Sequence, residues 1–374
     1  MNELGDYCKK CVLKENKPNV YFDENGLCNI CKGDALKGST NRFRMALRRC
    51  LEYEKNVGKN SSGCYDCLLM LSGGKDSIYM LTQLLQKDIR VLPFTLNHPY
   101  ESKFSSRNIE KCIEKLPMES ITYALNTEIF KKILRDVFML KENHTTFHSH
   151  QLPCAVCTCM IQLSAYFFAR KLKIPYVLYC ADPIQMTTFP DLKELVQVVV
   201  DISGLQPLYD MFDQETIDAI LAGDEDTVKI VYPYANVKDY NAERIIDELK
   251  EKGLYESSPY ETHCSLYSVL NYYSFCKNDN MFYSGEIANS VRAGALDRDQ
   301  TIKFIELYKT LFVNYARKEN LTEEDQQYMK DILRLKFGEN EDALNNEFNN
   351  ILNMFTRTED NAEFVDMVLK SKIF

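Results

Sequence analysis

Apolar runs alternate with amphipathic stretches through the middle of the chain. The apolar runs cover residues 64–71, 90–96, 120–126, 176–180 and 228–234. Between them, apolar residues recur at helical spacing in stretches such as 78–87, 106–115, 128–141 and 158–172. This alternation predicts an α/β fold with a doubly wound, parallel, five-stranded sheet. Ligands of such sheets bind at the carboxyl ends of the strands, where Ser72, Asn97 and Cys180 fall.

The same pattern divides the chain into four consecutive parts. We expect a cysteine knuckle at residues 1–37 and a charged helix with a polar linker at 38–62. The α/β domain should cover 63–275, and a helical region should cover 276–374. The end of that helical region is acidic, and the sequence assigns no chemistry to it.

A tight polar turn follows the first apolar run. Its residues, called here the 72–77 segment, are Ser72, Gly73, Gly74, Lys75, Asp76 and Ser77. Glycines let the backbone approach a ligand closely, and serine hydroxyls with the free amides of a helix start can hold an anion. The order of residues differs from a Walker A loop, in which the lysine follows a longer glycine-rich stretch. The segment is a candidate pyrophosphate cradle, and the alternative is an ordinary strand-to-helix turn.

The 72–77 segment resembles the SGGxDS signature of the PP-loop ATP pyrophosphatase superfamily, whose members cleave ATP between the α and β phosphates. The resemblance implies an adenine nucleotide alpha-hydrolase-like sheet that binds ATP and Mg²⁺ at these six residues. It also implies catalytic roles for Lys75, which would stabilise phosphate charge, and for Asp76, the nearest carboxylate for metal or water. An adenosine-contacting position would lie at the end of the second strand, beside His98, which we expect to be a solvated loop residue.

Composition narrows the setting of this chemistry. The 374 residues carry a net charge of −9, with 45% hydrophobic and 26% charged residues, as in a soluble globular protein rather than a basic nucleic-acid binder. No apolar run of membrane-spanning length and no signal peptide are expected, so we predict a cytoplasmic protein without a membrane partner. In that compartment the 14 cysteines indicate metal or sulfur chemistry instead of disulfides.

Two CxxC pairs near the start, Cys8 with Cys11 and Cys28 with Cys31, lie sixteen residues apart. This spacing predicts a tetrahedral four-cysteine zinc site with a structural or docking role; the alternative is four unrelated buried cysteines. The surrounding pattern resembles the N-terminal knuckle of N-acetyl sugar amidotransferases, which are also PP-loop enzymes. The matched positions outside the cysteines are Pro18, Phe22, Asp23 and Gly26. Residues 282–305 resemble the C-terminal segment of the same enzymes, where an Arg-x-Gly turn precedes an arginine and a helix.

A third CxxC pair, Cys154 and Cys157, follows Pro153 in an expected loop, with a helix expected from residue 160. The pair could act as a persulfide-carrying dithiol, bind zinc with His148, His150 or His263, or be buried apolar residues. It also resembles the CxxC of [4Fe–4S]-dependent tRNA thiolases, and that resemblance implies cluster ligands at Cys154, Cys157 and Cys264. Cys159 and Cys180 are expected close to these three cysteines, in sequence or in the sheet, so either could also be a ligand. The remaining cysteines, expected in the core, are Cys50, Cys64, Cys67, Cys112 and Cys276.

One departure from the thiolases bears on the substrate. Their fourth strand ends in a Gly-His-Asn type loop, whereas this chain continues with Cys180, Ala181, Asp182 and Pro183. The departure argues against a nucleic-acid substrate and makes Asp182 a candidate substrate-facing carboxylate.

Together these features predict ATP-dependent adenylation of an acceptor oxygen with release of pyrophosphate. Because the third CxxC carries specific chemistry, sulfur transfer to a small molecule or tRNA is expected next, with a separate sulfur donor. The alternative is an N-acetyl sugar amidotransferase that receives ammonia from a separate glutaminase subunit. A third hypothesis is a non-catalytic zinc-knuckle scaffold, which the intact 72–77 segment argues against. A homodimer is a further expectation.

Overall fold

The computed structural model describes residues 7–317, apart from short gaps, and residue 342. The gaps are residues 17–19, 34–35, 60–62, 139, 141–151, 182–190, 224–227, 238–239, 257–263, 265–269, 272–273, 276–278, 293 and 295. The chain divides into two compact units. One comprises Met1–Leu36, Met139–Leu152 and Pro259–Phe374, and the other comprises Lys37–Phe138 and Pro153–Ser258.

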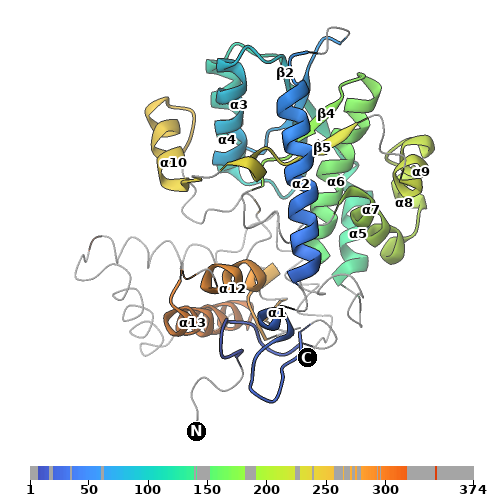
Figure 1. Cartoon of the computed structure of the whole chain (residues 1–374). Coiled ribbons are helices and arrows are strands. Elements are labelled where there is room, and N and C mark those ends of the chain that lie inside the picture. Colours follow the sequence, from blue (N-terminus) through green and yellow to red (C-terminus); the bar gives the residue numbers. More distant parts are fainter. Residues whose placement is uncertain are drawn as a thin grey trace. The chain divides into compact units, whose positions relative to one another are not determined.

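The second unit is built around a parallel sheet with the strand order β3-β2-β1-β4-β5 (Figure 1). Its strands are β1 (Cys67–Met70), β2 (Val91–Asn97), β3 (Ile121–Ala124), β4 (Tyr176–Leu178) and β5 (Lys229–Val231). Leu68 of the central strand pairs with Leu92 on one side and with Val177 on the other. The order reverses direction between β1 and β4, so the crossover helices cover both faces. The predicted fold class is therefore confirmed.

Helices fill every crossover of this sheet. The helices of the unit are α2 (Leu36–Asn56), α3 (Lys75–Gln86), α4 (Lys103–Lys115), α5 (Thr127–Phe138), α6 (Leu152–Lys171), α7 (Leu192–Ser203), α8 (Gln206–Tyr209), α9 (Gln214–Ala222), η3 (Pro233–Asn236, a 3₁₀ helix) and α10 (Ala242–Glu251). Side-chain caps fix several starts: Ser102 accepts from the Ser105 amide, and Asp191 forms a capping box with Glu194.

The start of α6 corrects one expectation. Cys154 and Cys157 lie inside the first two turns of this helix, not in a loop before it. The physical reason is that proline, here Pro153, is tolerated in the first helical turn, where its missing N–H has no intrahelical partner. Most faces of α6 carry apolar side chains, among them the fully buried Leu163. Among the described helices, α6 is long and apolar enough to cross a membrane, but most of it is buried, as in the core helix of a globular protein.

The first unit combines the N-terminal cysteine segment with helices from the later part of the chain. Its helices are α1 (Asn29–Lys32), α12 (Ser284–Arg292) and α13 (Arg298–Arg317), which Figure 1 shows in dark blue and orange. Val12 and Val20 from the N-terminal segment share one apolar core with Ile302 and Ile305 of α13. Thirty N-terminal residues with few aliphatics thereby obtain buried surface from helices nearly 300 residues away in sequence.

An ion pair at the start of the central strands generates a pH prediction. The Arg90 guanidinium donates to both carboxylate oxygens of Asp66, with Nη2 to Oδ1 at 2.6 Å and Nε to Oδ2 at 3.1 Å. These hydrogen bonds hold the pKa of the buried Asp66 carboxyl below its usual range. Asp66→Asn should lower the free energy of unfolding at neutral pH by about 1–2 kcal/mol, since Arg90 is partly solvated.

Because the folded pKa is depressed, this stabilisation is present above the unfolded pKa of about 4 and is lost as pH falls below it. Urea titrations followed by far-UV circular dichroism at several pH values measure the difference between the wild type and the variant. Asp247→Asn, at an exposed position on α10, is the control. A difference that stays constant down to pH 3 contradicts the account.

Candidate functional site

The 72–77 segment lies at the carboxyl end of the central strand, where the order of the sheet reverses. Ser72 follows β1 by two residues, and α3 begins at Lys75, so Lys75, Asp76 and Ser77 form its first turn. Gly74 is the N-cap residue and provides no side-chain cap. The first amides of a helix have no intrahelical acceptors, and they point toward the position of a bound anion. The predicted strand, turn and helix start are all present.

The two serines of the segment stabilise its own backbone. The Ser77 hydroxyl donates to the Gly74 carbonyl at 3.0 Å, and the Ser72 amide donates to the Ser77 oxygen at 3.2 Å. Ser77 is buried, whereas Ser72 is exposed. Ser77 thus shapes the turn, and Ser72 with the first-turn amides is better placed to contact a ligand.

Gly73 permits the turn to pack against the segment after β2. Its φ is +73°, and a Cβ atom there would lie 2.4 Å from the carbonyl oxygen of Ser105. Asn108, on the same helix as Ser105, donates to the Gly73 carbonyl at 3.1 Å and to the Glu256 carbonyl at 3.1 Å. The turn is therefore held by two other parts of its unit, and sequence reasoning identified neither contact.

Both carboxylate oxygens of Asp76 have partners. Lys75 Nζ lies 3.0 Å from Oδ2, and the Tyr240 hydroxyl donates to Oδ1 at 2.7 Å. The Tyr234 hydroxyl donates to the main-chain carbonyl of Asp76 at 2.8 Å. Tyr240, from the region after β5, thus orients the carboxylate assigned to metal or water, and Tyr234 fixes the backbone of the same residue. Sequence reasoning missed this role, because nothing in the spacing of Tyr234 and Tyr240 indicates a contact with residue 76.

The end of β4 brings cysteines toward the same edge. Burial raises the pKa of the Cys180 thiol, and the charge of Asp76 adds to the effect. Burial also raises the pKa of Tyr179, with further contributions from charges on Tyr232, Cys154 and Cys180. The start of α6 is therefore close to the end of β4.

The three-cysteine set Cys154, Cys157 and Cys264 stays a prediction. Cys154 and Cys157 are half-buried and lie three residues apart on α6, a spacing that places two side chains on one face of a helix. Cys264 is also half-buried and belongs to the other unit.

Two titratable residues follow β2. His98 is half-buried, with its ring centroid 6.2 Å from that of Phe130, and burial lowers its pKa to about 4. His98 lies in the loop after β2, as expected, but it is not fully solvated, because Tyr100 and Phe130 pack against it. Burial also raises the pKa of Glu101 to about 7, which makes it a candidate proton donor or acceptor that the sequence did not indicate.

The cysteines expected in the core differ in burial. Cys50, Cys67 and Cys112 are buried as predicted, whereas Cys64 is exposed because it precedes β1 instead of lying in it. Several candidates lie outside the described residues, namely His148, His150, Asp182, His263 and Cys276.

The four N-terminal cysteines form a cluster that can hold a metal ion. The Sγ atoms of Cys8, Cys11, Cys28 and Cys31 all lie within 4.8 Å of one another, and Cys11 and Cys28 are 3.8 Å apart. A tetrahedral ion with bonds of about 2.3 Å requires sulfurs about 3.8 Å apart. The Cys28 amide donates to Cys8 Sγ at 3.3 Å, and the Cys31 amide donates to Cys28 Sγ at 3.3 Å. Such N–H···S contacts stabilise thiolates, the form that binds metal.

Two arginines from the C-terminal helices contact this cluster. Arg298 donates from Nη2 to the Cys8 carbonyl at 2.9 Å and from Nε to the Cys11 carbonyl at 3.3 Å. Arg292 approaches Cys31 Sγ at 3.8 Å. The helices thus fix the first CxxC turn and place a positive charge beside the second.

Gly73 provides a test of the turn. Gly73→Ala should abolish ATP binding and destabilise the protein, because the left-handed backbone alone costs about 1–3 kcal/mol and the new methyl group meets the Ser105 backbone. Gly223→Ala is the control, since its φ is +82° and its nearest neighbour is the flexible end of Lys193. Calorimetric titration with Mg·ATP and urea unfolding measure the two effects. If the two variants had the same affinity for Mg·ATP and the same free energy of unfolding, the close approach to Ser105 would not matter for the turn.

Arg298 provides a test of the metal cluster. Arg298→Ala should speed metal loss to a chromogenic chelator by roughly tenfold, because its hydrogen bonds from a charged group hold the first CxxC turn. Lys303→Ala, at an exposed position of α13, is the control. Metal release at the wild-type rate would remove Arg298 from this role.

Comparisons with known proteins give a limited result. No protein-family model matches the chain, and no curated protein matches it. Among solved structures, the chain is similar to NMN synthetase from Francisella tularensis, with 13% identity, 60% of this chain and 97% of that chain covered, and a TM-score of 0.28. A likeness at this level supports no argument about function, which depends on the geometry described above.

Proposed function

We propose that this protein is an ATP-dependent adenylating transferase. The observation that supports this proposal is the 72–77 segment itself, a helix start with uncapped amides at the reversal point of a parallel sheet. Lys75 and Asp76 add a cation and a carboxylate at that helix start. This combination suits a triphosphate with its magnesium ion.

The first step forms a bond between an acceptor oxygen and the α-phosphorus of ATP. The bond from that phosphorus to the bridging oxygen breaks, and pyrophosphate leaves with the electron pair. The amides of the first turn and Lys75 stabilise the charge on the phosphates. Asp76, held by Tyr240 and Lys75, would bind Mg²⁺, which would supply further positive charge at the phosphates. A nucleophile then attacks the activated carbon, and AMP leaves with the acceptor oxygen.

We infer that nitrogen is the transferred element. The supporting observation is that Arg292 and Arg298 of the amidotransferase-like C-terminal segment contact Cys31, Cys8 and Cys11 of the amidotransferase-like knuckle. The two stretches that resemble these enzymes therefore form one packed unit. Ammonia would come from a separate glutaminase subunit, and zinc is the proposed ion of the knuckle, where four thiolates leave no open position.

Sulfur transfer is the second candidate. It is supported by Cys154 and Cys157, which lie on one helix near the end of β4. With Cys264 these residues would hold a [4Fe–4S] cluster, which supplies an open iron that can carry sulfide. A negative net charge of −9 favours a small-molecule acceptor over tRNA for either element.

Asp76 tests the adenylation step. With ATP and a small-molecule cell extract, the wild type should exchange labelled pyrophosphate into ATP, and Asp76→Asn should reduce the rate by roughly a hundredfold or more. Tyr240→Phe should retain the carboxylate and show a smaller loss. Total tRNA replaces the extract in a parallel series. Absence of exchange with both acceptor pools would support the scaffold hypothesis instead.

Anaerobic purification followed by iron, sulfide and zinc analysis distinguishes nitrogen transfer from sulfur transfer. Nitrogen transfer predicts zinc alone, with pyrophosphate release that responds to added ammonium. Sulfur transfer predicts iron and sulfide that Cys154→Ser removes, and a response to added sulfide.

A further inference from the structure

We propose that a cavity between α2, α3, η3 and α10 is a second small-molecule site. Its ligand is an organic anion with an apolar ring body, and its occupancy changes ATP binding through Tyr240. Binding of this ligand does not rest on the proposed transferase reaction. Only its effect on ATP binding involves the 72–77 segment.

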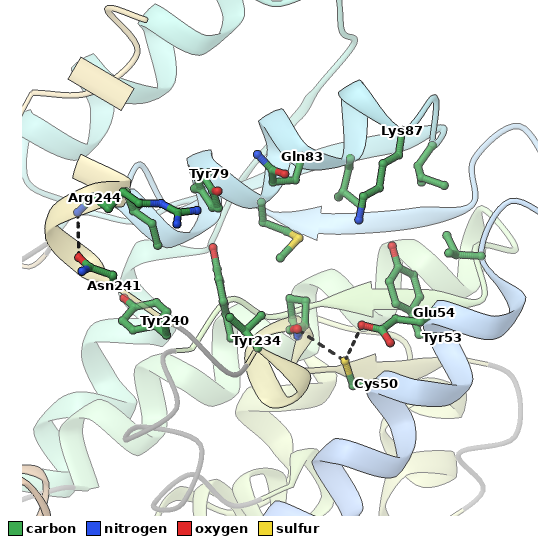
Figure 2. Close-up of a pocket in the computed structure, with 17 residues that line it drawn as sticks. Cys50, Tyr53, Glu54, Tyr79, Gln83, Lys87, Tyr234, Tyr240, Asn241 and Arg244 are labelled. Carbon is green, nitrogen blue, oxygen red and sulfur yellow. Dashed lines mark hydrogen bonds between the residues drawn. The ribbon is translucent and has the colours of Figure 1, made fainter. Parts of the chain in front are cut away.

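The cavity has a volume of about 520 Å³, within the range of about 300–1,000 Å³ that small-molecule sites occupy. The described residues that line it all belong to the sheet unit. Figure 2 shows α3 above the cavity, α10 with Arg244 at one end, α2 with Cys50 and Glu54 at the other, and Tyr234 of η3 between them. Residues 72–77 do not line it, so the cavity is separate from the ATP cradle.

The lining has the composition of a ligand site. Met80, Leu84 and Ile245 provide apolar surface, and the rings of Tyr79 and Tyr240 offer flat faces. These surfaces suit a ring-shaped, largely apolar body.

Charge is distributed unevenly along the cavity. Arg244 extends beside Tyr79 at the end formed by α10, where the lining residues that the structure describes include no carboxylate. Lys87 and Glu54 lie at the other end, on α3 and α2 respectively, and offset each other's charge. A ligand should therefore place its anionic group at Arg244, whose planar guanidinium suits carboxylate, sulfonate or phosphate.

Two tyrosines join this cavity to the nucleotide segment. Tyr234 and Tyr240 line the cavity, and their hydroxyls bond the carbonyl and the carboxylate of Asp76. Their rings meet edge to face, with centroids 5.6 Å apart. A ligand that packs on Tyr240 changes the position of its hydroxyl, and with it the orientation of the carboxylate that holds Mg·ATP. Such coupling is reciprocal, so ATP must change the affinity of this ligand by the same factor.

The probe for the site is 8-anilinonaphthalene-1-sulfonate, an anionic ring compound whose fluorescence rises in apolar surroundings. The wild type should show one saturable site by fluorescence and equilibrium dialysis. Arg244→Glu should weaken binding at least tenfold, and Met80→Trp, which fills the cavity, should abolish it. Lys250→Glu is the matched control, because it makes the same charge change at an exposed position of α10 that does not line the cavity.

Circular dichroism verifies that each variant is folded. If Met80→Trp does not fold, Arg244→Glu provides the decisive comparison, because Arg244 lies at an exposed position. Wild-type affinity in Arg244→Glu overturns the site. Saturating probe should shift the dissociation constant of Mg·ATP at least threefold in the wild type but not in Tyr240→Phe. An unchanged constant in the wild type overturns the coupling. Probe binding without any ATP binding would instead count against the proposed transferase function.

Discussion

The close approach of Gly73 to the backbone of Ser105 is the constraint on which the site depends. A side chain at residue 73 would occupy the space of the Ser105 carbonyl, so the turn after β1 can pack on α4 only with glycine there. Asn108 then bonds both the turn and Glu256, which connects three segments of the unit. This packing aims the amides at the start of α3, because the N-cap residue Gly74 has no side chain to cap them.

A second constraint operates where the N-terminal cysteine segment packs on α12 and α13. The knuckle has too few aliphatic residues for a core of its own, and it shares one with α12 and α13. Arg298 bonds the carbonyls of two cysteines, and Lys14 pairs with Asp279 at 2.6 Å and Glu306 at 3.1 Å. A metal ion in the cluster would therefore stabilise C-terminal helices as well as the knuckle.

Local patterns predicted most of the sheet unit. Alternating apolar runs and amphipathic stretches identified all five strands, because each crossover helix has its own apolar face. Helix α7 was missed: its run of valines at 198–200 fits a strand equally well, and the capping box at Asp191 decides for a helix. The motif located the nucleotide segment, since its function resides in six consecutive residues. Tyr240, Asn108 and Arg298 could not be predicted, because their roles depend on contacts with residues 35 or more positions away.

The central claim is that this helix start directs cleavage of ATP between its α and β phosphates. The most direct measurement uses ATP labelled at the α phosphate, incubated with the protein, Mg²⁺ and a small-molecule extract, followed by chromatography of the labelled products. The account predicts labelled AMP in amounts equal to the pyrophosphate released, and none from Gly73→Ala. Labelled ADP with free phosphate, in place of AMP, would contradict it.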